Sequence, residues 1–124
     1  MNEYDQRFDP PAPIISIKVA NPNSGNFELL RMQIDTGADI SAIPEKLIKE
    51  LKLTPVRYIS SCDYKGRESQ ELTYFVNISF QEYDFNYTEV ISSGEENALL
   101  GRDILNKLRL MLDGKALYFE IADP

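Results

Sequence analysis

Short stretches of alternating apolar and polar residues, separated by turn formers, limit what this chain can fold into. Between residues 15 and 19, Ile and Val alternate with Ser and Lys, which is the period-two pattern of a half-buried strand. Residues 21–26 are rich in Asn and include a Pro and a Gly, which all favour turns. A second strand is expected over 27–34, so the two segments predict a β-hairpin.

The remainder of the chain continues this pattern. Further strands are predicted over 55–61, 70–80, 85–91, 110–113 and 116–121. Pro44 stands where a helix can begin, and a short apolar stripe follows at 47–51. A second helical segment is expected at 103–108. Many short strands with two short helices predict a mostly β fold.

The size of the chain fits one domain. It has 124 residues, of which 43% are hydrophobic and 27% charged, as is ordinary for a globular protein. Residues 1–13 are polar and contain three prolines, and we predict that they form an extended arm outside the core. The domain itself is expected to span residues 14–124.

Charge and hydropathy bear on partners and location. The net charge of −7 disfavours nucleic acid, because phosphate binding needs clustered Lys and Arg. No apolar run approaches the roughly 20 residues that span a bilayer, so no membrane partner is expected. The first residues are acidic and polar, without the basic start and apolar stretch of a secretory signal. We therefore expect a cytoplasmic protein.

Two residue types are nearly absent, and this narrows the chemistry. The chain has no histidine, which excludes Ser-His-Asp and Cys-His nucleophiles and imidazole metal sites. Cys62 is the only cysteine, so neither an intrachain disulfide nor a thiolate metal cluster can form. Hydrolytic chemistry would have to use carboxylates, hydroxyls, lysine or an oxygen-ligated metal.

The sequence Asp35-Thr36-Gly37 stands at the end of the predicted strand 27–34. Met32 and Ile34 share one face of that strand, and Asp35 follows on the opposite face. Asp and Gly also favour ordinary turns, so the tripeptide alone does not decide between a turn and a reactive site. The apolar strand before it and the small Ala38 after it favour a site.

Two segments resemble the signatures of retropepsin-like aspartic proteases. Met32-Gln33-Ile34-Asp35-Thr36-Gly37-Ala38-Asp39 resembles the active-site segment of that family, and Leu99-Leu100-Gly101-Arg102-Asp103-Ile104-Leu105 resembles its second signature. The resemblance covers about residues 14–121. It implies a retropepsin-like acid protease half-barrel that is homodimeric, with an aspartic endopeptidase activity and no cofactor or metal.

The resemblance also implies roles for individual residues. Asp35 would be the catalytic carboxylate, and Thr36 would brace the site by hydrogen bonding to the facing chain. Gly37 would let the substrate backbone approach closely, because it has no Cβ. Asp39 and Arg102 would form a supporting pair, although both could also be unpaired surface charges.

Substrate would lie between the site and a flap, the hairpin at 58–68 that closes over a bound peptide. The flap tip has one glycine, Gly66, where many relatives have several. The residues expected to contact substrate are Gln33, Gly37, Ala38, Asp39, Ser61, Cys62, Asp63, Tyr64 and Leu99.

A single Asp-Thr-Gly implies two chains. Peptide hydrolysis by water needs a base and an acid at once, and two adjacent carboxyl groups that share one proton supply both. Asp35 and its copy would meet on the axis of a C2 homodimer. The terminal strand at 116–121 is the expected contributor to a shared sheet, because its edge would otherwise be open. The arm at 1–13 is a second candidate.

Two other functions remain open. The same fold could serve as an inactive dimerisation or peptide-binding module. A metal-dependent hydrolase could use Asp35, Asp39 and Asp103, although these residues lack a recognisable ligand spacing.

Overall fold

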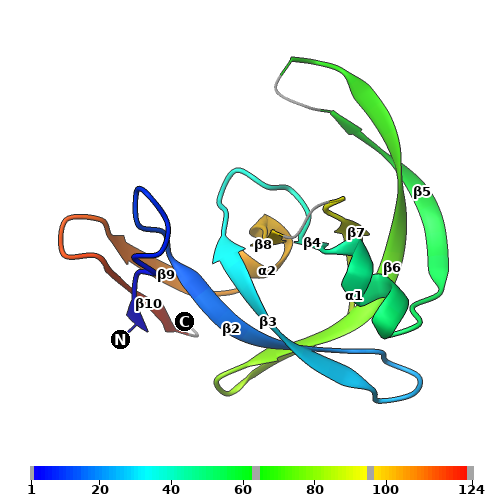
Figure 1. Ribbon diagram of the computed structural model, residues 1–124, viewed down its shortest axis with the longest axis horizontal. Helices are drawn as coiled ribbons and strands as arrows, with labels where there is room; N and C mark the ends of the chain where they lie inside the picture. Colours follow the sequence, from blue (N-terminus) through cyan, green and yellow to red (C-terminus); the bar gives the residue numbers. More distant parts are fainter. Residues whose placement is uncertain (1, 63–64, 95–96, 123–124) are drawn as a thin grey trace.

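The computed structural model describes residues 2–62, 65–94 and 97–122, with Ser61 as backbone only. The largest element of this part of the chain is one strongly curved sheet (Figure 1). In chain order its seven strands are β2 (Ile14–Ala20), β3 (Phe27–Ile34), β4 (Ala42–Ile43), β5 (Pro55–Cys62), β6 (Glu68–Phe80), β7 (Tyr83–Ser92) and β8 (Ala98–Leu100). The predicted mostly β fold is confirmed, and each predicted strand lies within two residues of its expected bounds.

The sheet closes on itself. Its strand order is β2-β3-β8-β4-β7-β6-β5, and β2 also pairs with β6, where residues 18–20 meet 77–79. Two neighbouring pairs, β3–β8 and β4–β7, are parallel, so segments far apart in the sequence lie side by side. Strands β4 and β8 are only two and three residues long, too short for a periodic pattern to predict them.

Both predicted helices are present and short. Helix α1 (Glu45–Glu50) begins directly after Pro44 and buries Leu47 and Ile48. Helix α2 (Arg102–Leu105) ends earlier than the predicted 103–108, because the amides of residues 107 and 108 bond three residues back, to 104 and 105. No helix in the described part of the chain is long and apolar enough to cross a membrane.

One hydrophobic core joins these elements. Its fully buried side chains come from strands of the closed sheet, from α2 and from the last strand of the chain; they include Ile17, Met32, Ile43, Ile78, Val90, Leu100, Ile104 and Phe119. Alternate residues of β2 point inward, as the sequence pattern predicts, since Ile15, Ile17 and Val19 are buried.

A second, smaller sheet lies at one end of the molecule (Figure 1). It consists of β1 (Asn2–Glu3), β10 (Tyr118–Ala122) and β9 (Arg109–Asp113), in that order across the sheet. The last strand was expected to offer an open edge for a second chain. That expectation is wrong, because β10 lies in the middle of the sheet and pairs with β1 on one side and β9 on the other.

The N-terminal segment is bound to the domain. After β1, the amide of Tyr4 donates to Leu117 O at 2.9 Å. The chain then turns back on itself, with backbone hydrogen bonds of 2.7 and 3.2 Å between Asp5 and Ala12. Ala12 is buried. Residues 2–12 are therefore not the wholly extended arm outside the core that the prolines suggested.

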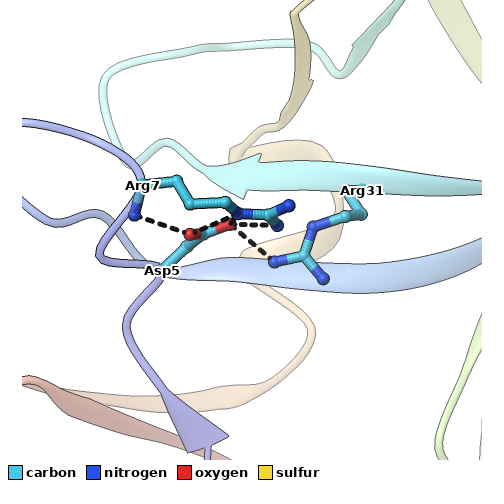
Figure 2. A network of polar contacts seen from close by, with 3 residues as sticks. All are labelled: Asp5, Arg7 and Arg31. Carbon is cyan, nitrogen blue, oxygen red and sulfur yellow. Dashed lines mark hydrogen bonds and ion pairs between the residues drawn. The ribbon is translucent and has the colours of Figure 1, made fainter.

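An ionic cluster ties this segment to β3 (Figure 2). The Asp5 carboxylate accepts from the Arg7 guanidinium at 2.7 Å and from Arg31 of β3 at 2.8 Å, and its side chain is only 6% exposed. Hydrogen bonds from Arg7, and then from Arg31, hold the pKa of Asp5 well below its usual range. Asp5 is therefore charged in the folded protein at neutral pH.

A second ionic cluster braces the long β5–β6 hairpin against β7. Arg57 donates two hydrogen bonds to Glu89, at 2.7 and 2.8 Å, and the hydroxyl of the fully buried Thr73 donates to the same carboxylate at 2.5 Å. These bonds, chiefly that from Arg57, lower the pKa of Glu89 to about 2. The carboxylate links three neighbouring strands.

Gly101 marks the closest approach of two loops. A Cβ at this position would lie 2.9 Å from Ala38 O, 3.0 Å from Ile40 C and 3.1 Å from Ile40 O. All three are backbone atoms, which cannot move aside as the end of a flexible side chain can. A glycine is required here for space rather than for its backbone conformation.

We expect Gly101→Ala to lower the free energy of unfolding by about 1–3 kcal/mol, because it overpacks a backbone contact. The matched control is Gly114→Ala, where a Cβ would meet nothing within 4 Å. Its effect should stay within about 0.5 kcal/mol. Urea unfolding of both variants measures the difference. Equal stabilities would show that the two loops can separate without cost.

The Glu89 cluster predicts a pH dependence. A carboxylate whose pKa is lower in the folded than in the unfolded state stabilises the fold above its usual pKa of 4.5, and the contribution is lost as pH falls toward about 2. The difference in free energy of unfolding between wild type and Glu89→Gln should therefore be constant above pH 5 and shrink below it. Urea unfolding from pH 7 to pH 3 measures this difference, and a difference that does not change with pH would contradict the assignment.

Candidate active site

Asp35 directly follows the last residue of β3, next to β8 in the closed sheet. Met32 and Ile34 of β3 point into the core, whereas Gln33 and Asp35 are half-buried on the other face, as predicted. The parallel pairing of β3 with β8 continues one residue beyond the strand, where the Asp35 amide donates to Leu100 O at 3.0 Å. The two signature segments therefore meet at Asp35.

The loop after Asp35 turns tightly around its carboxylate. The Gly37 amide donates to Asp35 Oδ1 at 2.9 Å, and the Ala38 amide donates to Asp35 O at 3.2 Å. A Cβ at Gly37 would lie 3.2 Å from the same Oδ1 atom. The absence of a side chain at Gly37 thus leaves the carboxylate open on the side where the loop is exposed.

Arg102 holds the outer part of this loop. Its guanidinium donates to Thr36 O at 2.6 Å and pairs with the Asp39 carboxylate, and its amide donates to Ala38 O at 2.9 Å. The side chains of Asp39 and Arg102 are 85% and 41% exposed, so their ion pair contributes little to stability by itself. Together, the bonds of Arg102 to Thr36, Ala38 and Asp39 hold the loop after Asp35 in one conformation.

A buried hydrogen-bond network supports the loop from inside. The Ser41 hydroxyl donates to Asp103 Oδ1 at 2.8 Å and accepts from the Gly101 amide at 2.9 Å, while the Ser41 amide donates to Asp103 Oδ2 at 3.0 Å. Ser41 is fully buried. Asp103, considered from the sequence as a metal ligand, thus has both carboxylate oxygens bonded to Ser41. Among the residues described, no group of three or more His, Cys, Asp or Glu could hold a metal.

Sequence reasoning missed the role of Ser41. Nothing in its neighbourhood marks it, because its partner Asp103 is 62 positions away in the chain. The available signal was Asp103, the acidic residue of the second signature, whose carboxylate needs a hydrogen-bond donor when the helix that carries it packs against the core.

A groove of about 740 Å³ opens beside Gly37. This volume is in the range of small-molecule and peptide-side-chain sites. The residues around it come from the site loop, from β5 and from the strands between them: Gly37, Ala38, Asp39, Ile40, Ala42, Ile59, Ser60, Cys62, Ile91 and Leu99. Five of these are among the predicted substrate contacts, and the other five, Ile40, Ala42, Ile59, Ser60 and Ile91, were not predicted.

The remaining predicted contacts lie elsewhere. Gln33 lines a separate hollow of about 200 Å³, beside Asp5, Arg7 and Arg31 of the ionic cluster. Ser61 belongs to β5, and nothing is described of its side chain. The predictions for residues 63 and 64 fall outside the described residues. Cys62 is exposed and has a free thiol.

The β5–β6 hairpin forms one wall of the groove through Ile59, Ser60 and Cys62. In Figure 1 this hairpin rises beyond the closed sheet, on the opposite side of the view from β9 and β10. Its base is fixed by the Arg57–Glu89 pair, and its strands stay paired from Tyr58 to Cys62. The site therefore consists of a carboxylate on a rigid loop, a groove beside it and a long hairpin on the far wall.

The sequence and the fold were compared with those of known proteins. Residues 25–107 match the family model described as gag-polyprotein putative aspartyl protease. No curated protein matches the chain.

Three solved structures share the fold. EIAV protease, in a complex with the inhibitor HBY-793, is 21% identical, with a TM-score of 0.57 over 77% of this chain and 86% of its own. The simian foamy virus (mac) protease is 19% identical, with a TM-score of 0.55 over 76% of this chain and 92% of its own.

A bacterial protein covers more of the chain. The retropepsin-like aspartic protease from Rickettsia conorii is 16% identical, with a TM-score of 0.65 over 98% of this chain and 91% of its own. The family match includes both signatures, and all three structures have this fold. The chain therefore belongs to the gag-polyprotein putative aspartyl protease family and has a retropepsin-like fold.

Proposed function

We propose that the protein is an aspartic endopeptidase that acts as a C2 homodimer and hydrolyses peptide bonds with water. The observation that carries this proposal is the position of Asp35. Asp35 is half-buried at the end of β3, and one oxygen of its carboxyl group accepts a hydrogen bond from the amide of Gly37, a residue that lines the groove. A carboxylate held in this way by a backbone donor has a fixed direction without a metal.

The chemistry requires a second carboxyl group. Water must lose a proton as it attacks the peptide carbonyl, and the leaving nitrogen must gain one. Two carboxyl groups about 3 Å apart keep a single proton between them, because like charges resist double ionisation. One member then accepts the proton of the water while the other donates. The chain has one Asp-Thr-Gly, so the second group comes from another copy.

The groove accounts for substrate binding. Its lining is mostly aliphatic, with Ile40, Ile59, Ile91 and Leu99 among the contributors, so it suits apolar side chains of a peptide. The β5–β6 hairpin would serve as the flap that closes over the peptide and excludes bulk water. Two copies would join their grooves into one cleft across the axis.

One prediction of this proposal concerns the Asp35 carboxylate. We expect Asp35→Asn to reduce peptidase turnover by at least about 10²-fold while the protein stays folded and dimeric, because an amide cannot accept the proton of the water. Asp84→Asn, a change of the same kind at an exposed position of β7, is the control and should keep full turnover. Cleavage of a mixed peptide library, with and without a pepstatin-type inhibitor, measures both. Turnover that survives in Asp35→Asn would exclude Asp35 as the catalytic group.

Another prediction concerns the site that two copies would form together. Turnover per chain should fall steeply when the protein is diluted below its dimer dissociation constant, since a monomer has only half of the catalytic pair. Analytical ultracentrifugation over the same concentrations gives the dimer fraction for comparison. Constant specific activity down to a purely monomeric sample would mean that one chain is sufficient.

A further inference from the structure

A hollow with an excess of positive charge lies beside Gln33, two residues before Asp35. Its volume is about 200 Å³. Pockets that hold separate small molecules are generally larger, about 300–1,000 Å³, so this hollow has room for one side chain rather than for a whole ligand. The residues around it include Arg7, Phe8, Arg31, Gln33 and Asn97.

We propose that this hollow receives an acidic side chain of the substrate peptide, and that Arg7 is the residue that selects it. This inference rests on the proposed function and names the class of peptide that the site prefers. The charged and polar lining of the hollow differs from that of the main groove, which is mostly aliphatic. The site would therefore take apolar side chains on one side of Asp35 and a carboxylate on the other.

The position of the hollow suits a residue close to the bond that is cut. Gln33 lines the hollow and Gly37 lines the main groove, so the two lie on either side of Asp35 along the chain. Gln33 also pairs with Leu99 of β8, another residue of the main groove. Alternate residues of an extended chain lie about 7 Å apart and face the same side. An extended peptide cut at Asp35 would thus present to the hollow a side chain within about three residues of the cut.

The ionic cluster keeps an excess of charge and of donors. Figure 2 shows the guanidinium groups of Arg7 and Arg31 meeting at the carboxylate of Asp5, so two positive groups share one negative group. In the part of the chain described, Asp5 is their only side-chain partner, and it occupies Nε and Nη2 of Arg7 and Nη2 of Arg31. Nη1 of Arg7 is left to donate to a substrate carboxylate, and hydrogen bonds between these two charged groups are among the strong ones.

Arg7 and Arg31 differ in what they hold. Arg31 belongs to β3 and bonds Asp5, so it ties the N-terminal segment to the sheet. It also lines a second hollow together with Glu3, whose negative charge disfavours an anion on that side. Arg7 bonds only Asp5 of its own segment, and its side chain is 74% exposed. Replacing Arg7 therefore removes the excess charge and keeps the bond between the segment and β3.

Twin peptides test the preference. The peptide that wild type cleaves fastest in the mixed library supplies the sequence, and twins with Glu or Gln are made at each of the three positions on either side of the cut. At one position or more, we expect kcat/KM to be about three- to tenfold higher for the Glu twin, because the amide lacks the charge that Arg7 attracts. In Arg7→Gln this ratio should fall below about twofold, and a ratio that does not change would overturn the role of Arg7.

Three controls separate this effect from a general change in charge or fold. Lys46→Gln removes a positive charge at an exposed position of α1 and should leave the ratio unchanged. Arg7→Lys keeps the charge but not the planar group, so it should keep part of the preference. Added salt should lower the ratio in wild type, since a largely exposed charge is screened. Urea unfolding checks that each variant is folded, and the salt series needs no variant at all.

The outcomes separate this inference from the proposed function. If wild type cleaves peptides but treats Glu and Gln twins alike at every position, the inference is wrong and the proposed function stands. If wild type cleaves nothing, the peptide is selected by retention on the immobilised protein, and fluorescence anisotropy of labelled twins replaces turnover. Tighter binding of the Glu twin that Arg7→Gln abolishes would then support the hollow without the enzyme. Equal binding, or none, would overturn both.

Discussion

The buried hydroxyl of Ser41 connects the two parts of the chain on which the site depends. It donates to Asp103 and accepts from the Gly101 amide, so it joins the loop after Asp35 to the start of α2. The same two segments touch through backbone atoms at Gly101, Ala38 and Ile40, where no side chain fits. A loop fixed by buried bonds and by close backbone contact has little freedom, and the carboxylate at its beginning inherits that rigidity.

The residues that hold the loop after Asp35 in place lie apart from the residues that the loop exposes. The hydrogen bonds that hold the loop lie inside, at Ser41 and Asp103, while Thr36, Gly37 and Asp39 remain exposed. An exposed loop on a buried support suits a group that must meet a partner. The same division recurs in the β5–β6 hairpin, whose outer half lines the groove while its base is held by Glu89 and the buried Thr73.

Most of the fold was accessible from local pattern. Period-two alternation in β2 and β3, and the proline before α1, have physical causes that act within a few residues, so sequence alone located them. The order of strands across the small sheet was not accessible, because it depends on which distant segments pair. The prediction for the last strand failed for that reason: β1, at the other end of the chain, occupies the edge expected to be open.

The sequence by itself determined the Asp35-Thr36-Gly37 segment, the strand before it, its turn and the second signature that accompanies it, because residue type and spacing carry that information. The sequence left open whether Asp39 and Arg102 pair or are separate surface charges, and the tertiary structure decided that they pair. Tertiary structure alone decided that Gln33 lines a different hollow from the main groove. It also decided that Asp103 bonds Ser41. These outcomes join residues up to 63 positions apart. Contacts at such separations are set by how the closed sheet brings its strands together, which no local pattern encodes.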